Sequence, residues 1–161
     1  MRDKTTVFLG GTCGKNTWRD DFIERLVARG VPREALFNPV VPDWNAEVQA
    51  REDKMKADPS VMLMFYLGDT KDEVDMYRGE GDTGNYFLSF YSLHEAEMSL
   101  YDAPERTAIV IDPTGIVPRA AKRMQKVCSD LQKRFPGHPI FGSLEEAEDW
   151  IVKNFAAAKA A

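Results

Sequence analysis

The fold is decided by residues 61–67, the heptapeptide VMLMFYL, in which every side chain is apolar or aromatic. A strand with one face in water alternates polar and apolar residues, whereas a strand covered on both faces is apolar throughout. We therefore expect this segment to be the central strand of a parallel sheet. Parallel strands need long crossover connections, so helices should lie on both sides of it in the sequence.

Short apolar runs alternate with longer runs of helical period along the rest of the chain. Four further strands are expected, at residues 6–9, 35–37, 107–111 and 139–141. Apolar stripes predict helices at residues 18–27, 44–55, 117–135 and 144–155, and another helix carries Glu95. Five strand-helix units with right-handed crossovers predict an α/β flavodoxin-like three-layer sandwich with strand order 2-1-3-4-5.

Length and composition indicate one globular domain, because 161 residues with 43% hydrophobic and 29% charged side chains suffice for one core. We expect this domain to cover residues 1–155 and a disordered tail to cover residues 156–161. The net charge of −5 disfavours a nucleic-acid surface, and no apolar run reaches the length of a bilayer span. With no signal-peptide core after Met1, we expect a cytoplasmic protein with a small-molecule partner, no nucleic acid and no membrane.

Metal and disulfide chemistry are not predicted. The two cysteines are far apart, and the two histidines form no ligand cluster with them. Residues 68–88 are acidic and glycine-containing, but their spacing is not that of a calcium loop. A segment this long without secondary structure is typical of a mobile lid or of disorder. We therefore expect no metal and no cofactor.

The carboxyl edge of the strands is the usual binding crevice of an open α/β sheet. Three segments are expected to meet there: residues 10–16, the residues after Tyr66, and the start of the Glu95 helix. The first segment does not have the spacing of a phosphate-binding P-loop. Its glycines would let a ligand approach the backbone, or would only form a tight turn. Asp69 and Asp112 follow strands at the same edge, where turn and capping residues are common.

Glu95 is the main candidate for catalysis, and two interpretations of it are open. Residues 92–95 have the pattern of a capping box, in which Glu95 would only bond to the first amide of its helix. Alternatively, its carboxylate faces the crevice and acts as a nucleophile.

Glu52 lies four residues after Val48 and three before Met55, beside the apolar stripe of its helix. A carboxylate there either reaches water at the edge of the stripe or is buried and paired. Burial in a pocket would raise its pKa and suit it to proton donation. Two acids, one attacking an anomeric carbon and one assisting the leaving group, form the machinery of retaining glycosyl transfer.

Three motifs occur in a familiar order: VFLGGT at residues 7–12, NPVVPDW at residues 38–44 and SLHEAEM at residues 92–98. Together they resemble the nucleoside 2-deoxyribosyltransferase superfamily, and especially its deoxyribosyltransferase-like branch. The resemblance extends from about residue 7 to residue 113. It implies cleavage or transfer at the N-glycosidic bond of a nucleoside or nucleotide, with a glycosyl-Glu95 intermediate. Glu52 matches an acid that binds or protonates the base.

The resemblance also implies a substrate pocket and allows a homo-oligomer in which a neighbouring copy completes that pocket. The implied substrate-binding residues are Phe8, Gly10, Gly11, Thr12, Cys13, Asn38, Asp69, Ser89 and Ser92. Ser89 stands where the characterised transferases have an Asp that holds the sugar hydroxyls, and Phe8 stands where a Tyr is frequent. Because both departures concern the sugar site, no particular sugar is predicted.

Two other functions are compatible with the same residues. Segment SFYSLHEAE, residues 89–97, is similar to the catalytic helix of flavodoxin-like TIR domains, which would imply cleavage of NAD. A non-catalytic module that senses a nucleotide or binds a protein could use the same crevice. Release of free base from nucleosides, nucleotides or NAD separates these functions.

Overall fold

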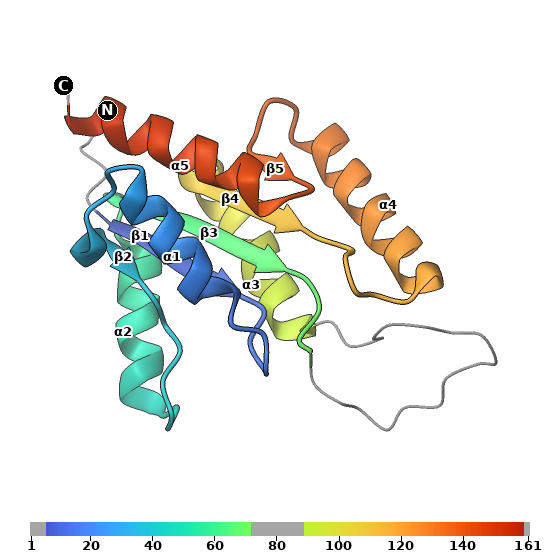
Figure 1. The fold of residues 1–161 in the computed structure, drawn as a ribbon, viewed down its shortest axis with the longest axis horizontal. Helices are drawn as coiled ribbons and strands as arrows, with labels where there is room; N and C mark the ends of the chain where they lie inside the picture. Colours follow the sequence, from blue (N-terminus) through green and yellow to red (C-terminus); the bar gives the residue numbers. More distant parts are fainter. Residues whose placement is uncertain (1–5, 72–88, 160–161) are drawn as a thin grey trace.

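A computed structural model describes residues 6–71 and 89–159 of the chain (Figure 1). Its five strands form one parallel sheet of order β2-β1-β3-β4-β5, which confirms the predicted flavodoxin-like topology. Beyond Lys71, the segment for which a lid or disorder was expected lies outside the described residues.

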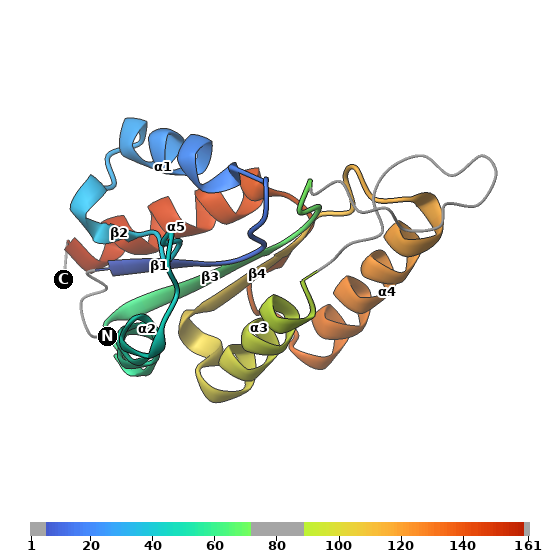
Figure 2. The same ribbon diagram turned by 90° about the horizontal axis from the view of Figure 1, so that it is seen from below.

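The sheet is covered by helices on both faces. The strands are β1 (Thr6–Gly11), β2 (Leu36–Phe37), β3 (Val61–Leu67), β4 (Thr107–Ile111) and β5 (Ile140–Phe141). The helices are α1 (Trp18–Ala28), α2 (Ala46–Ala57), α3 (Phe90–Asp102), α4 (Pro118–Arg134) and α5 (Leu144–Lys159), with 3-10 turns η1 (Arg33–Ala35) and η2 (Pro104–Arg106). Helices α1 and α5 lie on one face, and α2, α3 and α4 lie on the other (Figure 2).

Strand β3 lies at the sheet centre and is buried over its whole length, as its sequence predicts. Its alternate side chains supply two separate cores. Met62 and Met64 pack with α1 and α5, whereas Leu63 and Phe65 pack on the side of α3 and α4. Burial on both faces explains why no position of this strand is polar.

Two predicted element boundaries in the first half of the chain were wrong. Strand β1 does not end at Leu9 but continues through Gly11, because both glycines pair with β3. Helix α2 begins at Ala46 rather than Trp44, because the Asn45 side chain accepts hydrogen bonds from the first free amides of the helix. Trp44 is therefore outside the helix and 61% exposed instead of packed on its apolar face.

The predicted disordered tail was wrong in part, because α5 continues to Lys159. The segment AAAK consists of strong helix formers, which extend a helix already anchored by packing. A capping box starts this helix: the Ser143 amide donates to the Glu146 carboxylate at 3.2 Å, and the Glu146 amide donates to the Ser143 hydroxyl at 3.4 Å. No helix in the described part of the chain is long and apolar enough to cross a bilayer.

Candidate functional site

Glu95 lies in the second turn of α3 and does not cap the helix. The helix begins at Phe90, and Ser89 is its N-cap, accepting hydrogen bonds from the Ser92 amide and hydroxyl. The capping-box interpretation of Glu95 was therefore wrong, because the true cap lies three residues earlier than Ser92. The Glu95 side chain is 17% exposed, and its Oε1 accepts a 2.6 Å hydrogen bond from Lys56 Nζ of α2.

The Glu95 carboxylate has a second oxygen, Oε2, besides the one that binds Lys56. Oε2 of Glu95 has no hydrogen-bond partner among residues 6–71 and 89–159. The ion pair with Lys56 requires an ionised carboxylate, which is also the form that attacks an electrophile. Glu95 thus combines an anchored oxygen with a free one, an arrangement that orients a nucleophile without blocking it.

Glu52 is buried at 8% exposure and is the one buried residue of α2. Burial is the main cause that raises the pKa of its carboxyl group; the positive charge of Lys56 opposes this rise, and the negative charge of Glu95 adds to it. The structure therefore brings the two predicted acids into one electrostatic cluster. Their surroundings differ, because Glu95 is paired with Lys56 whereas burial raises the pKa of Glu52.

Lys56 pairs with Glu95 and lies 3.6 Å from Asp53 Oδ1, and the charge of Glu52 also acts on it. This lysine was not among the predicted site residues. Burial acts to lower the pKa of its ammonium group, but the hydrogen bond and charge of Glu95 outweigh burial and raise it. Its Nζ also lies 5.8 Å from the ring centroid of Phe8, which stacks on Phe37 at 5.7 Å. One signal was present in the sequence, since Lys56 follows Glu52 at helical i,i+4 spacing.

A pocket of about 470 Å³ opens between α2 and α3, with Glu95 and Lys56 in its wall. Tyr91, His94, Met98 and Arg106 also line it, so its lining mixes aromatic, cationic and anionic groups. The volume lies within the range of roughly 300–1,000 Å³ that is typical of small-molecule sites. Glu52 is not among the lining residues.

The predicted glycines of β1 have structural roles. A Cβ atom at Gly10 would lie 2.6 Å from the Phe65 ring and 2.8 Å from the Phe8 ring. Gly11 has a φ of +107°, and a Cβ there would lie 2.1 Å from the carbonyl oxygen of Tyr66. Both glycines thus allow the close packing of β1 against β3.

The loop after β1 is held to the loop after β3 by protein groups. The Thr12 hydroxyl both donates to the Gly68 carbonyl and accepts from the Gly68 amide. The buried Arg19 guanidinium donates to the carbonyls of Leu9, Gly11 and Thr12. Strand β2 pairs with β1 only at Val7 and Phe8, so it does not reach these carbonyls. Arg19 supplies the hydrogen-bond donors that a longer β2 would have provided.

Four other predicted binding residues also make local contacts. Cys13 is exposed and donates to the Gly11 carbonyl, and the Asn38 side chain accepts from the Val40 amide. Asp69 accepts from the Lys71 amide. Ser92 is buried and pairs with the helix cap at Ser89. None of these four residues, nor that cap, lines the Glu95 pocket.

The prediction that three segments share one crevice was wrong in its third part. The loops after β1 and β3 do converge, since Asn16 donates a 2.6 Å hydrogen bond to the Asp69 carbonyl. They line a polar pocket of about 300 Å³ with Tyr66 and Asp112, whose side chains are joined by a 3.0 Å hydrogen bond. Glu95 instead faces α2, where it pairs with Lys56, and its pocket is lined by residues of α2, β3, α3 and the turn before β4.

Within the described residues, no group of three or more histidine, cysteine or acidic side chains could hold a metal ion. Comparisons with protein-family models, with curated proteins and with solved structures find no match to this chain.

The raised pKa of Glu52 predicts a specific pH dependence of stability. Between the unfolded and folded pKa values the folded protein binds more protons, so the free energy of unfolding falls as pH rises through that window. Glu52→Gln cannot ionise and escapes this loss. Its stability relative to the unsubstituted protein should therefore rise as the pH increases above about 4, the ordinary range of a glutamate, in urea unfolding. Glu47→Gln, an exposed change on the same helix, should show no such rise; an equal rise would contradict the assignment.

Proposed function

We propose that the protein cleaves or transfers the N-glycosidic bond of a nucleoside or nucleotide through a covalent glycosyl-Glu95 intermediate. The observation that carries this proposal is the pair of acids around Lys56. Glu95 is anchored as a carboxylate with one open oxygen, and Glu52 is buried with a raised pKa. This division between nucleophile and proton donor is what retaining glycosyl transfer needs.

The reaction follows from these two roles. A Glu95 oxygen forms a bond to C1′ while the bond from C1′ to the base nitrogen breaks, and the base leaves with a proton that originates on Glu52. Because Glu52 does not line the pocket, a water molecule or Lys56 carries that proton to the base. Water or a second base then attacks C1′, releases Glu95 and returns a proton to Glu52.

The pocket supports a substrate of nucleoside size. Its volume of about 470 Å³ accommodates a sugar and a base, and Tyr91 and His94 supply flat surfaces beside the carboxylate. Arg106 in the same wall is committed to the Val61 and Lys56 carbonyls. A 5′-phosphate is therefore not required by this proposal. The cytoplasm, where nucleosides and nucleotides are available, is the proposed compartment.

The test is incubation of the protein with nucleosides, nucleoside monophosphates and NAD in parallel. We expect release of free base and a sugar adduct on the intact protein, located at Glu95 by peptide mass spectrometry. Base release from NAD alone would favour the TIR-like alternative. Saturable binding measured by calorimetry, without release of any base, would contradict catalysis and identify a nucleotide-sensing module.

A further inference from the structure

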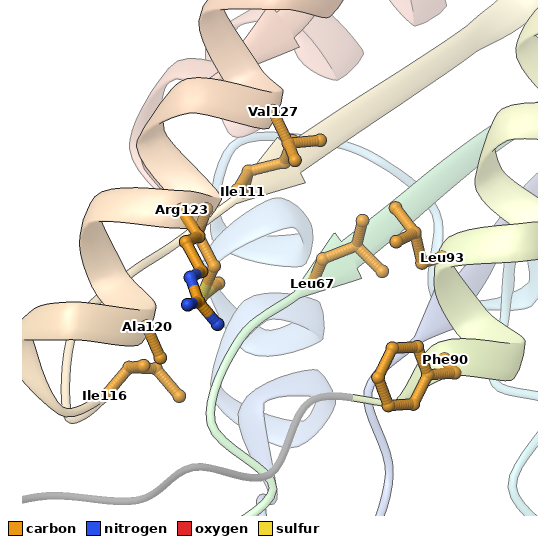
Figure 3. Close-up of a pocket in the computed structure, with 9 residues that line it drawn as sticks. Leu67, Phe90, Leu93, Ile111, Ile116, Ala120, Arg123 and Val127 are labelled. Carbon is orange, nitrogen blue, oxygen red and sulfur yellow. The ribbon is translucent and has the colours of Figure 1, made fainter.

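A second pocket, of about 260 Å³, lies at the carboxyl ends of β3 and β4 between α3 and α4 (Figure 3). Its wall is formed by apolar side chains from four elements, among them Leu67 of β3, Ile111 of β4 and Leu93 of α3. It shares no lining residue with the Glu95 pocket. The proposed reaction gives this pocket no role.

Arg123 is the one charged side chain in this apolar wall. It is exposed on α4, and its side chain extends from the helix toward the space between α4 and the end of β3 (Figure 3). The reason is its position on the helix, three residues after Ala120 and four before Val127, which both line the pocket. Its guanidinium has no hydrogen-bond or ion-pair partner in the described part of the chain.

The mouth of the pocket is also apolar. Phe90, the first residue of α3, lines the pocket and is 81% exposed. The site thus offers an apolar cavity, an aromatic rim and one cation that has no partner among residues 6–71 and 89–159.

We propose that this pocket binds a small amphipathic carboxylate, whose hydrocarbon tail fills the cavity and whose carboxylate pairs with Arg123. A planar guanidinium binds a carboxylate through two parallel hydrogen bonds, which match the single charge of such a ligand. The volume is slightly below the range of roughly 300–1,000 Å³ for typical ligand sites, which selects a short chain or a single ring. A multiply charged phosphate would leave charge uncompensated among apolar walls.

The test uses octanoate as the probe and 1-octanol as its uncharged counterpart, with binding followed by calorimetry and by methyl resonances of Leu67 and Ile111. We expect saturable octanoate binding. Arg123→Gln should weaken it by about tenfold and leave 1-octanol binding unchanged, because only the charge-assisted bonds are lost. Lys122→Gln removes a charge from the same helix outside the pocket and should change neither affinity.

Ala120→Phe, which places a ring in the cavity, should abolish binding of both probes. The proposal is overturned if octanoate does not saturate the protein in the millimolar range, or if Arg123→Gln binds it as tightly as Lys122→Gln does. Glu95→Gln should bind octanoate like the unsubstituted protein. Failure of the glycosyl-transfer proposal would therefore leave octanoate binding unaffected. Failure of octanoate binding would likewise leave the release of free base unaffected.

Discussion

Glu95→Gln should lower release of free base by at least roughly 10³-fold, as expected when a covalent nucleophile is removed. The amide keeps the shape of the side chain and an oxygen that can accept from Lys56, so the protein should still fold. The loss of the charged hydrogen bond should lower the free energy of unfolding by only about 1–2 kcal/mol. Initial rates of base release and urea unfolding, measured on the same preparation, give both values.

Glu97→Gln is the matched control, because it removes the same charge from α3 at a position that does not line the Glu95 pocket. Its base release should stay within about twofold of the unsubstituted protein, as for a surface change without a role in the reaction. Equal activity in Glu95→Gln and Glu97→Gln would exclude Glu95 as the nucleophile. The sugar adduct should be absent from Glu95→Gln and present in Glu97→Gln.

Gly11→Ala should have the largest effect on stability. The new Cβ would lie 2.1 Å from the Tyr66 carbonyl oxygen and 2.6 Å from its amide nitrogen, and both atoms belong to the backbone of β3. Relief of this clash requires separation of β1 from β3 at the centre of the sheet. We expect a loss of at least about 4 kcal/mol, a large part of the roughly 5–15 kcal/mol that stabilises a typical domain.

Gly30→Ala separates this clash from the cost of backbone conformation. Gly30 also has a positive φ, +90°, but a Cβ there would meet nothing within 4 Å. This change should therefore cost only about 1–2 kcal/mol, the penalty for an L-residue in the left-handed region. Thermal or urea unfolding of the two variants gives the comparison. Similar losses in both would show that the contact between β1 and β3 is not the cause.

The fold was largely predictable because its signals are local and repeated. An apolar heptapeptide for β3 and helical stripes between the strands were enough to predict strand order and layers. The errors occurred at the ends of elements, where a single capping side chain determines at which residue a helix begins. Asn45 starts α2 and Ser89 starts α3, and neither cap was identified in advance.

The candidate site was predicted only in part. Glu95 and Glu52 could be selected because a carboxylate at a helix start or beside an apolar stripe is conspicuous in a sequence. Apart from its spacing to Glu52, nothing in the sequence separates Lys56 from the other lysines of the chain. Its ion pair with Glu95 depends on how closely α2 approaches α3. Arg123 is exposed, and its place at the edge of an apolar pocket depends on the gap between α3 and α4.

The chain by itself determined which residues form strands and helices, which faces are buried and where acids stand beside apolar surface, because spacing along one element sets these features. Only the tertiary structure decided that Glu95 pairs with Lys56 of α2, and that Gly11 packs against the backbone of β3. The physical reason is that charge pairing and steric contact act over a few ångströms between elements distant in sequence, where no periodic pattern records the distance.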